Sequence, residues 1–383
     1  YTRRNTLSLH DALPIYAALL GLEAHLPDSW WRETLLLTYG FARVDYREFA
    51  EKYLTWLSDR KKSGETHLAG LELAGAALLE IERPDEADQQ SQADRLVAAL
   101  QDETLKASAI VRARAGNTLA RLGDPRFRPD ACYLPDNPFI HIPAGRFTMG
   151  SDEKKDPQAY GDEQPQHEVD LGEYYIARYP VTVAQFRVFV EQSGYKPQDP
   201  DSLRGLPNHP VVNVTWYDAL KYCDWLTAQL PQLSNLPAEL RRGWRVTLPS
   251  EAEWERAARG TDGRIYPWVN EFDSDKANTY ESGIRGTSAV GCFPAGASPA
   301  GLLDASGNVW EWTRSCNEGY PYPKPGPERA ARERFTSDNK DVMVLRGGSW
   351  SYVSRHARCA YRRGDLPVNW GLSIGFRVSL SPL

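Results

Sequence analysis

The segments GLLDASGNVWEWT, at residues 301–313, and VLRGGSW, at residues 344–350, decide how this chain of 383 residues folds. The glycine pair in the second segment allows a strand to pass close to neighbouring backbone. We expect the Arg346 guanidinium beside it to pair with a buried carboxylate, either Glu311 or Glu251. These residues are therefore interpreted as organisers of the fold.

Upstream of these segments, the sequence predicts short strands, a few amphipathic helices and long turn-rich connections. In WRVTLPSEAEWERAARG, Ser250 can cap a helix and Glu253 can complete a capping box, with Trp254 facing inward. The 12 Trp residues of the chain provide large buried areas for such a loop-rich domain. Helices are predicted at residues 183–193, 216–229 and 250–259.

The first third of the chain has a different pattern. From residue 17 to about residue 124, apolar residues recur at three- and four-residue spacing, which indicates helices. The segment VRARAGNTLARLGDPRF, at residues 111–127, resembles the end of a HEAT-type helical repeat, in which a small-residue face packs on the preceding helices. A generic helical bundle is the alternative. Helices are predicted at residues 29–43, 46–58, 66–82, 91–100 and 103–122.

These patterns divide the chain into four parts. Residues 1–15, YTRRNTLSLHDALPI, resemble a translated sequencing adapter, so we expect the natural protein to be longer at its N-terminus. Residues 16–127 are predicted to form the helical domain. Residues 128–138 are proline-rich and predicted to be a linker, and residues 139–383 form the second domain.

Composition and charge exclude several classes of function. The net charge of −6 and the absence of a basic stripe argue against nucleic-acid binding. No apolar run approaches the roughly 18 residues that a membrane span requires, and we expect a cytoplasmic protein from a bacterium or archaeon. The five cysteines lack a C-x-x-C pair, which favours buried thiols over a disulfide framework or a zinc site.

Five separated segments carry a resemblance to a known family. The first four are FIHIPAGRFTMGS, QHEVDLGEYYIARYPVTVAQFRVFV, HPVVNVTWYDALKYCDWL and WRVTLPSEAEWERAARG. The fifth is GLLDASGNVWEWT, followed by VLRGGSW and by IGFRV at residues 374–378. In this order they resemble the formylglycine-generating enzyme and sulfatase-modifying-factor family. The resemblance implies an α+β fold, with a C-type-lectin-like domain after the all-helical, HEAT-like one.

A metal site is predicted in DASGNVWE, at residues 304–311. Two carboxylates flank a tight Gly-Asn turn, a spacing that lets oxygens converge on a hard cation. The resemblance implies structural Ca²⁺, held by the side chains of Asp304 and Glu311 and by the carbonyls of Gly307 and Val309. The alternative is a purely hydrogen-bonded turn, because Ca²⁺ takes about six to eight oxygens and only four are identified.

The resemblance stops at the catalytic residues. Formylglycine formation requires two thiols that bind copper(I), a metal that selects soft thiolates. The family places them just after its Gly-Gly-Ser-aromatic motif, where this chain has Tyr352 and Ala357. Cys359 matches a non-catalytic position. We therefore expect no copper and no enzyme activity.

The histidines also lack a catalytic pattern. Related iron-dependent sulfoxide synthases use three histidines from a helical domain, whereas the helical part here, after the adapter-like start, has only His25 and His67. A facial metal triad is therefore not expected. We interpret His141, His167 and His209 as structural polar contacts.

Binding is predicted between RGGSW and IGFRV, at residues 351–373. This stretch is rich in Tyr, Arg, Ser, Asn and Gly, the composition of adaptable binding loops with aromatic and arginine anchors. The expected ligand is a protein or another surface ligand. The candidate ligand-binding residues are Ser351, Tyr352, Val353, Arg355, His356, Tyr361, Arg363, Gly364, Asp365, Val368, Asn369, Trp370, Gly371, Leu372 and Ser373.

Three functions remain open at this point. A C-terminal segment of this kind resembles the variable proteins of diversity-generating retroelements, in which adenine-directed mutagenesis rewrites codons on a lectin scaffold. A second possibility is the C-terminal sensor module of a NACHT-type signalling or defence protein, whose NTPase region would precede this chain. The third is a formylglycine-generating-type oxidoreductase, which the missing thiols argue against.

Overall fold

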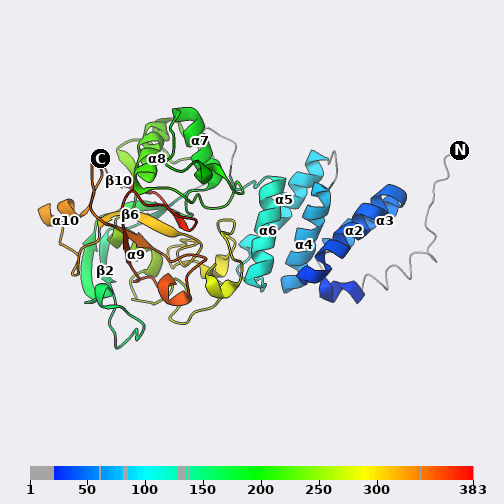
Figure 1. Ribbon diagram of the computed structural model, residues 1–383, viewed down its shortest axis with the longest axis horizontal. Coiled ribbons are helices and arrows are strands. Elements are labelled where there is room, and N and C mark those ends of the chain that lie inside the picture. Colours follow the sequence, from blue (N-terminus) through cyan, green and yellow to red (C-terminus); the bar gives the residue numbers. More distant parts are fainter. Residues whose placement is uncertain are drawn as a thin grey trace. The chain divides into compact units, whose positions relative to one another are not determined.

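The computed structural model describes residues 21–59, 62–80, 85–127, 134–135, 138–336 and 338–382. These residues fall into two compact units, one ending at Pro125 and one beginning at Arg126 (Figure 1). The adapter-like segment, at residues 1–15, and most of the predicted linker, at residues 128–138, lie outside the described residues.

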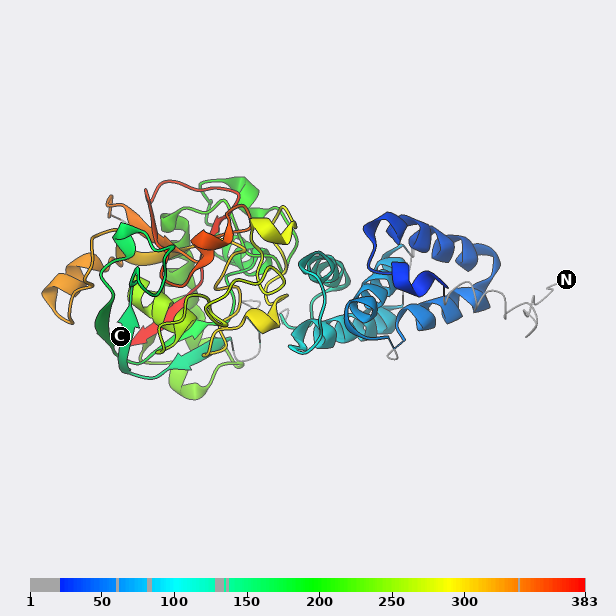
Figure 2. The ribbon, with the colours of Figure 1, turned by 90° about the horizontal axis from the view of Figure 1, so that it is seen from below.

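The first unit is entirely helical where it is described. Helix α4 lies between the α2–α3 hairpin on one side and α5 and α6 on the other (Figure 2). A Cβ at Gly75 of α4 would lie 2.8 Å from Thr118 Cγ2 of α6, so glycine allows these helices to pack closely. The elements are η1 (Glu23–His25), α2 (Ser29–Asp45), α3 (Arg47–Leu57), α4 (Gly64–Leu79), α5 (Glu86–Gln101) and α6 (Ala109–Leu122).

The sequence predicted these helices, with errors at their ends. Helix α5 begins five residues before the predicted start at residue 91, because Asp85 caps it by accepting a hydrogen bond from the Ala87 amide. Helix α6 begins at Ala109, after its cap Ser108, and not at the predicted residue 103. The polar residues before Ser108 form a turn that the apolar spacing did not reveal.

The second unit combines short strands with helices, which confirms the predicted α+β fold. One sheet has the strand order β1 (Phe139–Ile142), β4 (Tyr174–Ala177), β10 (Ser379–Pro382) and β5 (Trp244–Thr247). The last strand of the chain therefore lies between two much earlier ones. A second sheet has the order β8 (Arg363–Asp365), β7 (Met343–Arg346), β6 (Trp310–Cys316) and β9 (Ile374–Gly375). Strands β2 (Gly145–Met149) and β3 (His167–Leu171) form a separate pair.

Three helices of this unit begin at capping boxes, each encoded by residues three positions apart. Helix α9 starts after Ser250, whose hydroxyl accepts the Glu253 amide at 3.1 Å while the Glu253 carboxylate accepts the Ser250 amide at 2.8 Å. This confirms the predicted capping box. The helices are α7 (Val183–Ser193), α8 (Trp216–Gln229), α9 (Glu251–Arg259) and the short α10 (Pro327–Arg332).

Tryptophans fill the core of the second unit, as the sequence predicted. Trp216, Trp254, Trp310 and Trp312 are fully buried, and the indole N–H groups of all but Trp310 donate to acceptors in the core. Trp216 Nε1 donates to the Thr313 carbonyl at 2.8 Å, and Trp312 Nε1 donates to the Val214 carbonyl at 3.1 Å. The indoles thus join helix α8 to strand β6.

The cysteines of the described region are buried, as predicted: Cys223, Cys292, Cys316 and Cys359. Cys132 lies outside that region. Within the same residues, every helix is too short or too polar to span a membrane.

Candidate functional site

The predicted binding segment, at residues 351–373, leaves strand β7 through a tight glycine turn. Gly347 and Gly348 have φ angles of 93° and 73°, which favour glycine. A Cβ at Gly348 would lie 2.9 Å from both the Ala357 Cα and the His356 carbonyl oxygen. The glycine therefore lets the short helix η8 (Ser354–Ala357) fold back against the end of the strand.

Buried and accessible side chains divide this segment cleanly. All the predicted ligand-binding residues are half-buried or exposed, and none is buried. Leu366, which is 46% exposed, and Ser354, which is half-buried, are accessible as well but were not among the predicted residues. The buried side chains lie between the accessible ones: Ala357, Arg358, Cys359, Ala360, Arg362 and Pro367.

Two buried arginines anchor the segment to distant parts of the domain. Arg358 binds Glu163 through both Nη atoms at 2.7 Å and Asp156 at 2.6 Å. Arg362 donates through Nε and Nη2 to the Glu251 carboxylate at 2.7 and 3.0 Å. Bidentate, charge-assisted pairs of this kind fix geometry as well as contributing energy.

Glu251, at the start of helix α9, is shared among several arginines. Arg332 lies 3.1 Å away and Arg346 3.7 Å away, besides Arg362. Burial opposes ionisation of Glu251, but these guanidinium groups outweigh it and lower the pKa of its carboxyl group. Arg346 thus pairs with Glu251, one of its two predicted partners, and more closely with Glu255.

The carboxylate of Glu311, the other predicted partner, does not bind the Arg346 guanidinium. Both of its oxygens accept hydrogen bonds from Arg377 at 2.6 Å, and Trp254 Nε1 donates to Oε2 at 2.6 Å. Arg377 belongs to the IGFRV segment, so this pair fastens the end of the chain to strand β6.

An aromatic cluster lies between the two anchors. Tyr352 and Tyr361 pack on the buried Trp310, with ring centroids 5.2 and 5.7 Å away. His356 lies 5.4 Å from Tyr352 and 4.9 Å from Tyr361, edge to face in both cases. Tyr160, from a distant loop, stacks on His356 at 6.3 Å. Desolvation lowers the pKa of His356, which favours its neutral form.

Arginine side chains lie on the tyrosines around this cluster. The Arg355 guanidinium is 3.9 Å from the centroid of the Tyr160 ring, and Arg363 donates from Nη1 to the Tyr352 hydroxyl at 2.7 Å. Such contacts pre-order long side chains that would otherwise lose entropy on binding. Neither Tyr160 nor its contacts could be anticipated from sequence, because they come from a loop nearly 200 residues away.

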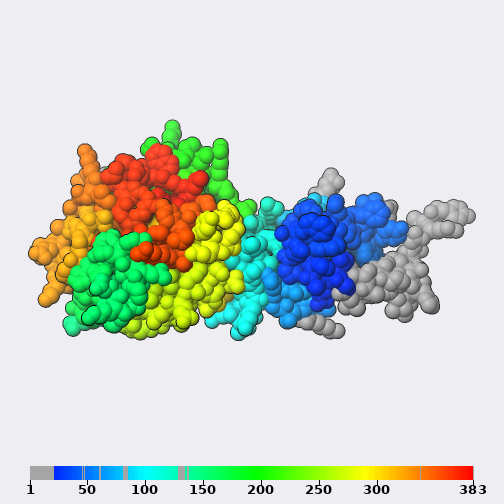
Figure 3. All heavy atoms as spheres, turned by 60° about the horizontal axis from the view of Figure 1, so that its bottom comes forward, coloured from blue at the N-terminus to red at the C-terminus, as the bar shows by residue number. Residues whose placement is uncertain are grey.

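Large apolar side chains complete the accessible area. Val368, Trp370 and Leu372 are exposed by 53%, 44% and 70%, although the backbone between them is held in place. The Trp216 amide donates to the Pro367 carbonyl, and the Asn213 amide donates to the Gly371 carbonyl. Figure 3 shows this segment, red to orange-red, as a continuous area of one face. We call the accessible residues of segment 351–373, together with Tyr160, the recognition face.

The positions of the family thiols lie inside this region. Tyr352 belongs to the aromatic cluster, and Ala357 is buried beneath Gly348. Cys359 is fully buried in the core, where desolvation raises the pKa of its thiol to about 12. A thiolate pair for copper(I) cannot form from these residues.

The predicted calcium site does not fit the observed contacts. Glu311 is neutralised by Arg377, and the Asp304 carboxylate accepts the Gly291 amide at 2.7 Å and the Asn308 side-chain amide at 3.4 Å. Burial raises the pKa of Asp304 to about 6. With Glu311 bound to Arg377, only Asp304 and the carbonyls of Gly307 and Val309 would be left to bind a cation. The contacts therefore favour the alternative prediction, a hydrogen-bonded turn.

The described residues also lack any group of three or more His, Cys, Asp or Glu side chains suited to a metal ion. The histidines make individual contacts instead. His167 accepts the Tyr322 amide at Nε2, 2.7 Å away, and His141 lies 3.2 Å from Glu173. His209 Nδ1 is 2.9 Å from the Thr287 hydroxyl, and burial lowers the pKa of this histidine to about 4.

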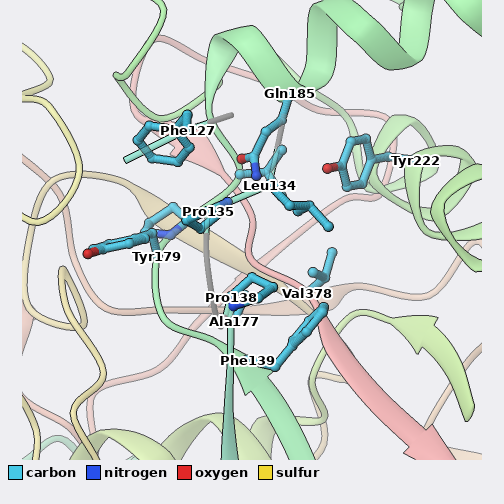
Figure 4. A pocket seen from close by; sticks show the side chains of 12 residues that line it. Phe127, Leu134, Pro135, Pro138, Phe139, Ala177, Tyr179, Gln185, Tyr222 and Val378 are labelled. Atoms are coloured by element: carbon cyan, nitrogen blue, oxygen red, sulfur yellow. The ribbon is translucent and has the colours of Figure 1, made fainter. Parts of the chain in front are cut away.

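A separate small pocket is lined mainly by apolar side chains, including Phe127, Phe139 and Val378 (Figure 4). Gln185 and Tyr222 also line it, but the side-chain oxygen Oε1 of Gln185 already accepts the Thr182 amide at 2.8 Å. We interpret this pocket as a packing defect between β1 and α7.

Comparisons with known proteins show the family of this chain. The family model of the sulfatase-modifying factor enzyme 1-like domain matches residues 128–381. Inactive C-alpha-formylglycine-generating enzyme 2 from Mus musculus is 30% identical over 309 residues, spanning 65% of this chain and 87% of that protein. Formylglycine-generating enzyme from Bos taurus is 29% identical over 313 residues, spanning 65% and 76%. Among solved structures, PvdO from Pseudomonas aeruginosa aligns with a TM-score of 0.51 and 26% identity, covering 63% of this chain and 94% of that one.

These relatives include one protein named as inactive and one named as an enzyme. Similarity to them therefore does not establish whether this chain has catalytic activity. The family predicted from the sequence motifs is confirmed. Together with the fold and the buried tryptophans, this match shows that the chain belongs to the sulfatase-modifying factor enzyme 1-like family.

Proposed function

We propose that this chain is a non-catalytic member of its family that binds a protein or another surface ligand through the recognition face. One observation carries the proposal: every candidate ligand-binding residue is accessible, while the buried residues of the segment are all outside the candidate set. A segment that served only as packing would not divide in this way. Its side-chain mixture of tyrosine, arginine and large apolar groups is typical of interface anchors.

The absence of the thiol pair supports binding over oxidation. Tyr352 and Ala357 occupy the positions that the family resemblance assigns to the copper(I) ligands, and the thiol of Cys359 is buried with a raised pKa. A buried, protonated thiol is a poor ligand and a poor nucleophile. On this proposal the chain does not oxidise a cysteine peptide in the presence of copper, and turnover in that assay would refute it.

The binding experiment compares two variants that each carry three substitutions. In the first, Val368, Trp370 and Leu372 are replaced by Ser. In the second, three exposed residues of α10 and its approach are replaced, Lys324→Ser, Glu328→Ser and Ala331→Ser. Tagged proteins are incubated with cell-surface extracts, and bound species are quantified by mass spectrometry. The proposal expects species retained by the wild type and the α10 variant to be lost from the first variant. Equal retention by both variants would place the site elsewhere.

A finer form of the proposal is that the recognition face varies between individuals, as in diversity-generating retroelements. The division of the segment into buried anchors and accessible positions supports it, because only the latter can change without disturbing the core. Neighbouring DNA tests this directly. A reverse transcriptase gene and a near-copy of codons 346–377 differing only at adenines would support it, whereas an upstream NTPase region in the same reading frame would favour the sensor alternative.

A further inference from the structure

Helix α2 carries a row of large apolar side chains that face solvent. Trp30, Leu37, Phe41 and Val44 are exposed by 76%, 71%, 67% and 82%, and Tyr46, just after the helix, by 45%. At roughly 100° and 1.5 Å per residue, the four helical positions lie within about 60° of arc and extend over about 21 Å. The inward side of the same helix is formed by Leu35, Tyr39 and Ala42, which are buried.

The size of this stripe is that of an interface. Single exposed apolar residues are common, but a contiguous patch of several large side chains marks an interaction surface. Taking aromatic side chains at about 150–250 Å² each, the stripe offers roughly 700 Å² of apolar area. That value is close to the ~800 Å² per partner of a standard protein interface.

We propose that the stripe binds the same stripe of a second copy of this chain, with the two α2 helices antiparallel. A two-fold axis near Leu37 places Leu37 against its equivalent and Trp30 against Val44 of the second copy, so that the bulkiest side chain meets a small one. Such an interface is self-complementary, as a two-fold contact must be. Gly40 adds room beside the stripe, since nothing lies within 4 Å of the position its Cβ would take.

Few described charges lie near the stripe on the outer surface of α2. Of the charged side chains of the helix that the structure describes, Glu33 lies nearest, at the edge of the stripe and opposite Phe41 of the second copy, whereas Arg43 lies about 120° from Leu37 around the helix. The pair would present two recognition faces, which increases the apparent affinity for a multivalent surface. The dimer itself does not depend on the proposed function.

The test is sedimentation equilibrium of the full chain between about 1 and 100 μM, the range in which interfaces of this size commonly associate. The wild type is expected to shift from monomer to dimer, and Leu37→Glu to remain monomeric at all concentrations. Because Leu37 is exposed and Glu is a good helix former, the circular dichroism of this variant should equal that of the wild type, and so should its melting temperature at about 1 μM, where the wild type is expected to be monomeric. Arg43→Glu is the matched control on the same helix and should still dimerise.

Crosslinking tests the antiparallel geometry. With a short bis-maleimide, Leu37→Cys should form crosslinked dimers beyond the wild-type background, whereas Trp30→Cys alone should not, because its two copies would lie about 21 Å apart. A mixture of Trp30→Cys and Val44→Cys chains should crosslink. A wild type that stays monomeric, a dimer that survives Leu37→Glu, open-ended assembly, or crosslinking of Trp30→Cys to itself would each overturn the proposal.

Discussion

Replacing Arg358 with methionine should destabilise the second unit strongly. The guanidinium is 1% exposed, and its partners Glu163 and Asp156 are 0% and 10% exposed at their side chains. Methionine fills much of the volume but leaves both carboxylates without their cation. Removing one partner of a buried ion pair typically costs about 3–5 kcal/mol, and we expect a loss in that range. Asp156 is the more accessible of the two and can be partly hydrated, so most of the loss should come from Glu163.

A second substitution separates charge from packing. In Arg358→Met with Glu163→Gln, the uncompensated carboxylate becomes a neutral amide that can still accept the hydrogen bond from the Ser151 hydroxyl. We expect the double variant to recover at least half of the loss. The control is Arg355→Met, the same change three residues earlier at a half-buried position, which should cost less than about 1 kcal/mol.

The assay is urea unfolding followed by far-ultraviolet circular dichroism and by tryptophan fluorescence, to which the buried tryptophans of the second unit contribute. Two results would refute the reasoning. One is a loss below about 1 kcal/mol for Arg358→Met, which would mean that the pair is hydrated. The other is a double variant as unstable as the single one, which would assign the loss to packing around the side chain.

Three further predictions follow from individual residues. Burial lowers the pKa of His209 to about 4 in the folded protein, against ~6.5 in the unfolded chain, so the unfolded state binds more protons between these two pH values. The free energy of unfolding should therefore fall by about 1.4 kcal/mol from pH 7.5 to pH 5.5. His209→Gln should reduce this difference in urea titrations at the two pH values. Gly348→Ala should lower stability by more than about 1 kcal/mol, because Gly348 has a left-handed φ and Ala357 lies close to it; a lower melting temperature would show this. Gly371→Ala should be nearly neutral, because its Cβ would meet only Ile374, at 3.8 Å. Chelator should leave the melting temperature unchanged at pH 7.5 if the Asp304 turn holds no Ca²⁺, and a clear drop would restore the calcium prediction.

Local sequence signals predicted much of the fold. The capping boxes at Thr182, Thr215 and Ser250 depend on residues three positions apart, so the helices that follow them could be placed almost to the residue. Helix α6 shows where such reasoning fails: apolar spacing continued through a turn that only the Ser108 cap ends. The family motifs supplied the fold class, because strands this short carry little signal of their own.

The candidate site was only half predictable. Its accessible residues lie in one continuous segment, which composition identified. Its anchors could not be paired from the sequence, because Arg358 reaches carboxylates 195 and 202 residues earlier. Neither could the role of Tyr160, which comes from the same distant loop. Glu311 appeared to be a metal ligand because its spacing from Asp304 suits one, and only Arg377, 66 residues later, reveals its actual partner.

The buried arginines explain how the segment can keep one path while its surface differs. A buried ion pair contributes little net stability compared with well-packed apolar groups, but a shift in register would leave its charges uncompensated at a cost of several kcal/mol. Arg358 and Arg362 therefore allow one register of the segment, whichever accessible side chains the segment carries. On this argument, Val368→Ser and Leu372→Ser should leave the amide of Trp216, bonded to the Pro367 carbonyl, as protected from hydrogen exchange as in the wild type. Faster exchange there in these variants would mean that the exposed side chains help to hold the path, and that the recognition face cannot change independently of the scaffold.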